Sequence, residues 1–441
     1  MTKRKSRVPT TRLGRLTRLG LTAGELALGG AVEGARRLTG GRAEGAFNVF
    51  LTATNARKLA RRLSGMRGAA MKMGQLLSME GSHLIPTEFA EALSVLRDSA
   101  DTMPRTQVRR IMGREYGKGW EQHFERFDYE PVAAASIGQV HHARTVDGRE
   151  LALKIQYPGV AKSIGSDVDN LATFLRWARI LPIAINLSGL IAETKRQLKQ
   201  EADYRQEARY LRDYRELVLA DPHFLVPRVH DDLTTRRILA MDYLSGEPIE
   251  TLGEKGVAQK LRDRVGAMLE GLLFRELFEF RTMQSDPNFA NYFYQPEEDR
   301  IVLLDFGSTM TFTKAFTDRY RRISLALIEE DEGAARHYAE QIGYLDPNDS
   351  TAHAERLMSV LRLVCEPIRY DGVYDFGASD LMSRSREAGL QMLLQSAGEF
   401  RAPPPQTAFL HRKLVGSFLI CARIKARVNV QALIRPYLRN V

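Results

Sequence analysis

The sequence is poor in cysteine and in long apolar runs, and its first residues are poor in acidic side chains. Only two cysteines occur among 441 residues, Cys365 and Cys421, and no CxxC motif is present. A disulfide framework or a zinc site is therefore not expected, and a reducing compartment suits the chain. The longest apolar stretch, residues 180–191, is interrupted by Pro182 and Gly189. We accordingly expect no transmembrane helix.

Positive charge is concentrated near the N-terminus. Residues 1–72 hold sixteen Lys or Arg and three acidic residues, a local charge of +13, so the rest of this +10 chain sums to −3. We predict a basic arm over residues 1–45 with three interpretations: a solvated tail, a contact with an anionic membrane surface, or a mitochondrial transit peptide. No aromatic interleaving, zinc spacing or recognition motif accompanies the charge, so nucleic acid is not expected as a partner.

Hydrophobic periodicity predicts an α+β fold, in which a helical extension precedes a small sheet-containing lobe and a larger, mostly helical lobe. Asp147-Gly148 is a turn signal between strands expected near residues 133–143 and at 150–156. Further elements are expected as follows: helices over 46–80, 88–97, 257–280 and after 313, one long amphipathic helix over 190–219, and a strand over 237–243. The predicted parts are 1–45 (basic arm), 46–130 (helical extension), 131–245 (N-lobe) and 246–441 (C-lobe).

Three short motifs occur in the order that protein-kinase-like enzymes need. Lys154 closes an apolar strand, Asp286 and Asn291 stand five positions apart, and Asp305-Phe306-Gly307 follows a second apolar run. In such enzymes these residues bind nucleotide phosphates, approach the attacking hydroxyl and hold Mg²⁺. We therefore predict an ATP or ADP site with Lys154 on the phosphates, Asp286 as the catalytic acid or base, and Asn291 and Asp305 on Mg²⁺. The pair Gln284-Ser285 replaces the usual His-Arg, which would make Asp286 an inefficient base.

The segment before Lys154 stands where a kinase carries its glycine-rich phosphate loop. Here alanines replace most glycines, and Ala adopts positive φ only at a cost, so we expect a stiffer loop. Its expected nucleotide contacts are Ala133, Ala134, Ala135 and Ser136.

A carboxylate on the expected helix 190–219 should orient Lys154. Glu207 is the first choice, with ordinary solvated pairs along the helix as the alternative. Kinase-like folds bind nucleotide where the lobes join, so Met241, Tyr243 and Leu244 are further expected contacts.

Together with Lys72-Met73-Gly74-Gln75, these motifs resemble the UbiB family of atypical kinase-like proteins, which includes the mitochondrial ADCK proteins. The resemblance extends from about residue 61 to the end of the chain and covers five motifs: K-x-G-Q, the Ala-rich loop 133–140, an E-x-D pair at Glu201 and Asp203, D-P-x-x-x-N at 286–291, and D-F-G at 305–307. The chain resembles the coenzyme-Q branch of the family, because it lacks the long C-terminal membrane anchor of the bacterial UbiB type.

The resemblance implies that the K-x-G-Q extension covers the substrate cleft, with Lys72 facing Glu201 and Asp203. We expect Lys72 to be a catalytic residue, and Gln75, Glu201 and Asp203 to be regulatory residues. It also implies binding of adenine nucleotide with Mg²⁺, slow lipid-responsive ATP hydrolysis and support of ubiquinone biosynthesis. The implied partners are an anionic membrane, lipid quinone intermediates and coenzyme-Q biosynthetic proteins.

The implied location is the bacterial cytoplasm at the inner membrane, or alternatively the mitochondrial matrix. A protein or small-molecule kinase and a nucleotide-gated scaffold remain alternatives for the function. No A-P-E motif follows Asp305, which argues against a protein kinase.

Overall fold

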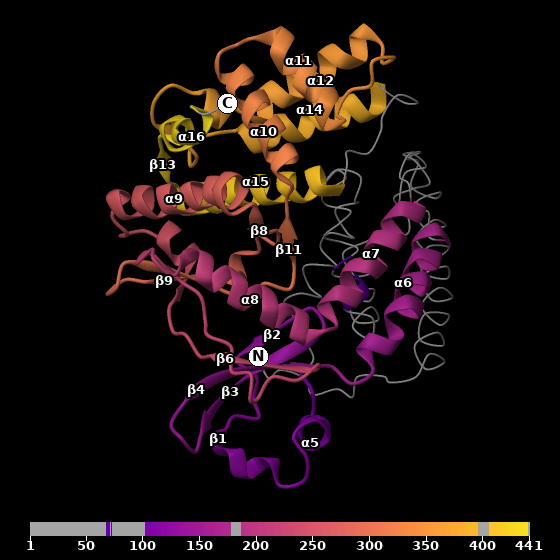
Figure 1. The fold of residues 1–441 in the computed structure, drawn as a ribbon, viewed down its shortest axis with the longest axis vertical. Coiled ribbons are helices and arrows are strands. Elements are labelled where there is room, and N and C mark those ends of the chain that lie inside the picture. Colours follow the sequence, from indigo (N-terminus) through magenta and orange to yellow (C-terminus); the bar gives the residue numbers. More distant parts are fainter. Residues whose placement is uncertain (1–67, 71, 73–101, 178–186, 396–404, 440–441) are drawn as a thin grey trace, which may run out of the picture. The chain divides into compact units, whose positions relative to one another are not determined.

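The computed structural model describes residues 68–70, 72, 102–177, 187–395 and 405–439 (Figure 1). The chain divides into two compact units, the first made of Met1–Ala208 with Val229–Tyr243 and the second of Arg209–Arg228 with Leu244–Val441. The predicted basic arm, most of the predicted helices 46–80 and 88–97, and Gln75 lie outside the described residues.

The first unit contains one antiparallel sheet in the order β1-β3-β4-β6, with β2 paired to β3. Its strands are β1 (Phe124–Phe127), β2 (Ala133–Ala134), β3 (Gly138–Thr145), β4 (Glu150–Gln156) and β6 (Ile238–Asp242). Gly148 in the β3–β4 turn has φ +88°, as the Asp-Gly signal predicts. The strands expected at 150–156 and 237–243 are confirmed, and the strand expected near 133–143 is divided into β2 and β3. The sheet begins with β1, which precedes the N-lobe start predicted at residue 131.

The helices of the first unit include α5 (Arg105–Glu115), α6 (Val160–Trp177), α7 (Leu187–Glu201) and the start of α8 (Tyr204–Val218). The single long helix predicted over residues 190–219 is therefore wrong, because α7 ends at Glu201. The Asp203 side chain accepts a hydrogen bond from the Arg205 backbone N–H at 3.1 Å. Asp competes for backbone donors in this way, which favours the start of a new helix over continuation of the old one.

One face of the sheet carries the hydrophobic core of the first unit. The odd-numbered side chains of β4, from Leu151 to Ile155, pack with Val108 and Met112 of α5 and with Trp120. The even-numbered Lys154 is therefore on the opposite face, because successive side chains alternate along a strand.

The second unit contains three small sheets and a larger set of helices. Its strands are β5 (Phe224–Leu225), β7 (Glu247–Pro248), β8 (Thr282–Gln284), β9 (Tyr292–Gln295), β10 (Arg300–Leu303), β11 (Thr309–Thr311), β12 (Tyr374–Asp375) and β13 (Arg427–Val428). The order β5-β10-β9-β7 forms the largest of these sheets, while β8 pairs with β11 and β12 with β13.

The helices of the second unit confirm the helical patterns predicted for it. They are α9 (Gln259–Phe274), followed directly by a π-helix (Arg275–Phe280), then α10 (Lys314–Ile328), α11 (Glu332–Ile342), α12 (Thr351–Val364), α13 (Glu366–Arg369), α14 (Leu381–Gln395), α15 (Pro405–Ile424) and α16 (Val430–Leu438). Short 3₁₀ segments are Trp120–His123 in the first unit and Ile249–Gly253 and Phe289–Asn291 in the second.

Helices α9 and α15 lie side by side (Figure 1) and enclose a buried carboxyl group. Glu270 of α9 accepts hydrogen bonds from Ser417 Oγ at 2.6 Å and from Cys421 Sγ at 3.4 Å. Burial raises the pKa of Glu270 to about 7. The neutral acid is therefore the favoured form of this side chain up to about neutral pH.

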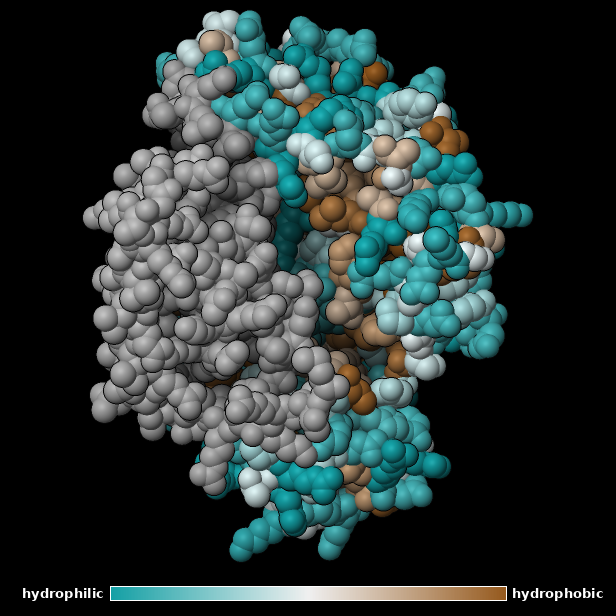
Figure 2. All heavy atoms as spheres, turned by 180° about the vertical axis from the view of Figure 1, so that it is seen from behind, coloured by the Kyte–Doolittle hydropathy of each residue, from teal (hydrophilic) through white to brown (hydrophobic). Residues whose placement is uncertain are grey.

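On the face drawn in Figure 2, the described residues are mostly hydrophilic. Hydrophobic residues form smaller patches among the hydrophilic ones. Within the described ranges, no helix is long and apolar enough to cross a membrane.

Candidate nucleotide site

Lys154 and Glu207 form a buried ion pair on the face of the first sheet opposite its core. Lys154 Nζ lies 2.6 Å from Glu207 Oε1, and their side chains are 8% and 3% exposed. The Tyr204 ring centroid lies 5.5 Å from the same ammonium group. Glu207 therefore points into the sheet, and the alternative of a solvated pair along the helix does not hold. The pair fixes the position of a cation on β4, inside the sheet.

The Ala-rich segment forms a tight hairpin between β2 and β3. Ala135 N–H donates to the Gly138 carbonyl at 2.9 Å; Ala133 and Ala134 are exposed and Ala135 is half-buried. None of the three alanines has a positive φ, so the turn suits Ala. Gly138 is required by a close approach, because a Cβ there would lie 2.5 Å from the Ile155 carbonyl oxygen. The hairpin is thus stiff, with a backbone that a phosphate can approach.

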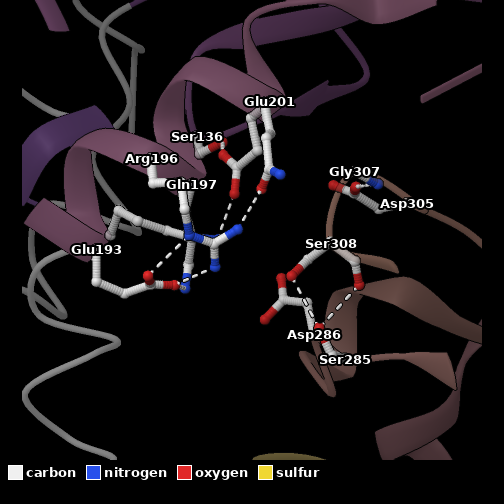
Figure 3. A network of polar contacts seen from close by, with 12 residues as sticks. Ser136, Glu193, Arg196, Gln197, Glu201, Ser285, Asp286, Asp305, Gly307 and Ser308 are labelled. Carbon is white, nitrogen blue, oxygen red and sulfur yellow. Dashed lines mark hydrogen bonds and ion pairs between the residues drawn. The ribbon is translucent and has the colours of Figure 1, made fainter. Parts of the chain in front are cut away.

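Glu201 connects this hairpin to Lys72. Ser136 Oγ donates to Glu201 Oε2 at 3.0 Å (Figure 3). Lys72 Nζ forms an ion pair with Oε1 of the same carboxylate. The Lys72 side chain is only 3% exposed. Gly68 packs so closely that a Cβ would lie 2.9 Å from a side-chain carbon of Ile137. The helical residues 68–70 and Lys72 therefore pack directly against the hairpin.

The remaining residues that we predicted as regulatory residues or as nucleotide contacts occupy different environments. Asp203 caps α8 by accepting the Arg205 backbone N–H. The side chain of Glu201 contacts Lys72 and Ser136. Met241 is buried in β6, whereas Tyr243 is 40% exposed and its ring centroid lies 4.3 Å from that of His142. Leu244 is the first residue of the second segment of the second unit, 244–441. The structure thus shows partners for Lys72 and Lys154, and the nucleotide contacts of Met241, Tyr243 and Leu244 stay predictions.

Asp286 and Asn291 lie in a short loop that ends in a 3₁₀ turn of the second unit. Asn291 Nδ2 donates to the Asp286 carbonyl at 3.1 Å, which directs the amide oxygen of Asn291 away from that bond. The Asp286 carboxylate forms an ion pair with Arg412 of α15. α15 also contacts Pro287 closely, because a Cβ at Gly416 would lie 2.1 Å from Pro287 Cγ. The C-terminal helix therefore shapes this loop and engages its carboxylate.

Asp305 follows β10 in a left-handed conformation with φ +60°. Its Oδ1 accepts the Gly307 backbone N–H at 3.1 Å (Figure 3), and Phe306 is fully buried with its ring 4.7 Å from that of Tyr214. A non-glycine residue in this conformation is strained, and such strain is concentrated at functional sites.

The residues predicted to hold Mg²⁺ offer oxygen donors of the right kind. Asp305 supplies a carboxylate and Asn291 an amide oxygen, and Mg²⁺ prefers such hard ligands, usually one or two carboxylates together with phosphates and water. The described residues contain no group of three or more His, Cys, Asp or Glu placed to hold a metal ion by themselves. The donor set therefore fits Mg²⁺ that arrives with nucleotide.

A second buried ion pair, between Lys413 and Glu276, lies next to the Asp286 loop. No motif in the sequence indicates this pair. Lys413 Nζ of α15 lies 2.9 Å from Glu276 Oε2 and 3.3 Å from Gln284 Oε1. Glu276 Oε1 accepts from the Gln284 backbone N–H at 2.9 Å, and Gln284 Nε2 donates to the Asp305 carbonyl at 3.1 Å. Burial alone would lower the pKa of Lys413, but the Glu276 carboxylate outweighs it and raises that pKa. This network joins the strand before Asp286 to Asp305.

Sequence comparison relates the chain to proteins described as kinases. A profile of the ABC1 atypical kinase-like domain matches residues 95–339. The mitochondrial atypical kinase COQ8B of Rattus norvegicus is 37% identical over 96% of this chain and 80% of its own. The mitochondrial atypical kinase COQ8 of Saccharomyces cerevisiae is 35% identical over 98% of this chain and 86% of its own.

A solved structure agrees with these matches. The Mycobacterium tuberculosis protein Rv3197, determined as a complex with erythromycin, is 26% identical, with a TM-score of 0.60 over 86% of this chain and 94% of its own. The predicted α+β, protein-kinase-like fold with its mostly helical second unit is therefore confirmed.

Proposed function

The chain belongs to the ABC1 atypical kinase-like family, and on that premise we propose that it binds ATP or ADP with Mg²⁺ and hydrolyses ATP slowly in support of coenzyme Q biosynthesis. The observation that carries the proposal is the buried Lys154–Glu207 pair at 2.6 Å. Burying two charges is costly unless they serve each other well. Kinase-like enzymes use such a strand Lys and helix Glu to bind nucleotide phosphates.

In this proposal the exposed hairpin backbone and Lys154 contact phosphate, and Asn291 and Asp305 hold Mg²⁺. Mg²⁺ neutralises charge on the phosphates when it is bound. The Asp305 left-handed turn and the Gln284 bond to its carbonyl keep the carboxylate in place before nucleotide arrives. Preorganisation of this kind lowers the cost of binding, since little rearrangement is needed.

Slow turnover follows from the surroundings of Asp286. A base must accept a proton from the attacking hydroxyl or water. The Asp286 carboxylate is instead paired with Arg412, which is only 8% exposed. The attacking group therefore competes with a fixed cation for the same oxygen atoms.

Lys72 and Glu201 supply the regulatory contact. Lys72 reaches the hairpin through Glu201 and Ser136, so movement of Lys72 changes the support of a phosphate-binding backbone. Lys72→Ala should therefore alter the rate of ATP hydrolysis while the fold survives. Wild-type rates in Lys72→Ala would show that this helix is not regulatory.

We further propose that the chain works at an anionic membrane surface with coenzyme-Q biosynthetic proteins and lipid quinone intermediates. The basic residues 1–45 would supply electrostatic attraction at roughly 1 kcal/mol per Lys or Arg near the surface. The two relatives are described as mitochondrial proteins. This description favours the mitochondrial matrix over a bacterial inner membrane as the location of the chain. Deleting residues 1–40 should weaken co-sedimentation with anionic liposomes, as should raised salt. Equal binding without the arm would assign lipid contact to another surface.

Phosphate release from ATP, measured with and without anionic liposomes, tests the proposed activity. We expect Mg²⁺-dependent release that rises with liposomes in the parent chain and is lost in Lys154→Met. Lys118→Gln is a matched control, because it also removes one cation but from an exposed position. Phosphate release that persists in Lys154→Met would show that the activity belongs to a contaminant or another site.

A nucleotide-gated scaffold is the second candidate, and the Asp286–Arg412 pair favours it over a protein kinase. A scaffold would bind Mg²⁺-nucleotide, with the same dependence on Lys154, and release no phosphate under any lipid condition. That result would retain the nucleotide site and remove the ATPase activity from the proposal.

A further inference from the structure

A basic cavity lies on the core side of the first sheet, between α5 and the start of α6. Its volume is about 170 Å³, far more than one water molecule needs. Its lining includes Arg110 and Arg114 of α5, Lys162 of α6, and Arg237. Four cations around one cavity contrast with the near-neutral charge of the chain beyond residue 72.

Three of the four cations have no acidic partner. Arg237 forms an ion pair with Glu115 at 3.2 Å. The side chains of Arg110, Arg114 and Lys162 form no hydrogen bond or ion pair in the part of the chain that the structure describes. Arg110 and Arg114 stand four positions apart on α5, a spacing at which like charges repel. An anion held between them would turn that repulsion into attraction.

Two further groups at the cavity can donate hydrogen bonds to the oxygen atoms of an anion. The Gln107 side chain stands on the same face of α5, and its Oε1 is buried without a hydrogen-bond partner. An amide can present either its oxygen or, after rotation, its NH₂ group to a ligand. Gly159, which has φ +78° and immediately precedes α6, and Ala161 in the first turn of that helix also line the cavity. Helix N-termini carry partial positive charge and free N–H groups.

We propose that this cavity binds a phosphate-bearing anion, and that it is distinct from the nucleotide site. The two positions lie on opposite faces of the sheet, because α5 packs on the odd-numbered side chains of β4 while Lys154 projects from the other face to Glu207. Guanidinium groups bind phosphate in a bidentate fashion, which suits the two arginines. The phosphate group belongs either to a lipid headgroup or to a soluble compound.

The test compares two double variants of the full chain that lose the same charge. Arg110→Gln with Arg114→Gln removes cations from the cavity. Arg109→Gln with Lys118→Gln removes two exposed cations nearby that do not line it. All four positions are exposed, so both variants should fold, and an unchanged Mg²⁺-ATP melting shift checks this.

One arm measures the melting shift with inorganic phosphate and with glycerol 3-phosphate, against chloride at equal ionic strength. The other measures co-sedimentation with phosphatidylcholine vesicles, with and without phosphatidylglycerol. Each cation near an anionic surface contributes about fivefold in affinity, so we expect a loss of about 25-fold in the cavity variant and binding close to the parent in the control.

The arms also identify the source of the phosphate. Loss confined to the soluble-phosphate arm assigns a soluble ligand, and loss confined to the vesicle arm assigns a lipid headgroup. Phosphate bound at the nucleotide site gives the same signal in both variants. Equal loss in both variants, or loss in neither, overturns the proposal.

Discussion

Replacing Glu207 by Gln removes one charge from a buried ion pair and leaves the shape of the side chain nearly unchanged. Lys154 Nζ lies 2.6 Å from the carboxylate that is lost, and its side chain is 8% exposed. The amide oxygen of Gln can still accept a hydrogen bond, but it no longer neutralises the ammonium group. The variant therefore isolates the electrostatic part of the contact.

The expected cost follows from the burial of Lys154. Removing one partner of a buried pair costs about 3–5 kcal/mol, because the remaining charge is left without compensation. At about 2–4 °C per kcal/mol for a unit of 150–250 residues, the melting temperature of the first unit should fall by roughly 6–20 °C. Replacing both residues, as Lys154→Met with Glu207→Leu, removes the orphaned charge and should recover much of this loss.

Denaturant unfolding of the parent, of Lys154→Met, of Glu207→Leu and of the double variant that combines them measures the coupling directly. Mg²⁺-nucleotide adds a second measurement, because bound phosphates would compensate Lys154 in place of Glu207. We therefore expect nucleotide to reduce the stability difference between Glu207→Gln and the parent. Additive single effects would show that the pair contributes no coupling, and an unchanged difference with nucleotide would place the phosphates away from Lys154.

Three shorter predictions concern the second unit. Asp305→Asn should abolish the Mg²⁺-dependent part of the nucleotide melting shift, and an unchanged shift would exclude Asp305 as a metal ligand. Arg412→Gln should raise the rate of phosphate release several-fold by freeing Asp286, and Asp286→Asn in the same chain should remove that gain. Because the pKa of Glu270 is raised to about 7, the folded state holds a proton that the unfolded state releases near pH 4.5. The free energy of unfolding should accordingly fall by about 3 kcal/mol as the pH rises from about 4.5 to 7, and Glu270→Gln should show no such fall.

The sequence predicted the local features of the candidate site well. Asp147-Gly148 marked a hairpin turn, and the apolar run before Lys154 marked its strand, because both signals depend on neighbouring residues alone. The pairing of Lys154 with Glu207 was also predictable, since the order of kinase-like motifs supplied the distant partner. The structure confirms that contact at 2.6 Å.

Other features depended on competition or on contacts far along the chain. The break between α7 and α8 is decided by Asp203, whose side chain takes a backbone donor that helical periodicity does not register. The pairs of Arg412 and Lys413 join residues more than a hundred positions apart. Arg412 and Lys413 are adjacent cations on an apolar helix, which indicates that acidic partners accompany them. Local sequence patterns do not identify these partners as Asp286 and Glu276.

The close contact of Gly416 with Pro287 has a consequence for truncated forms of the chain. A stop before residue 405 would spare every kinase-like motif and yet remove α15. Glu276 would then lose its buried cation, and Pro287 would lose the helix against which it packs. A late nonsense variant should consequently behave as a folding defect of the Asp286 loop, with insoluble or protease-sensitive product, although its catalytic sequence is intact.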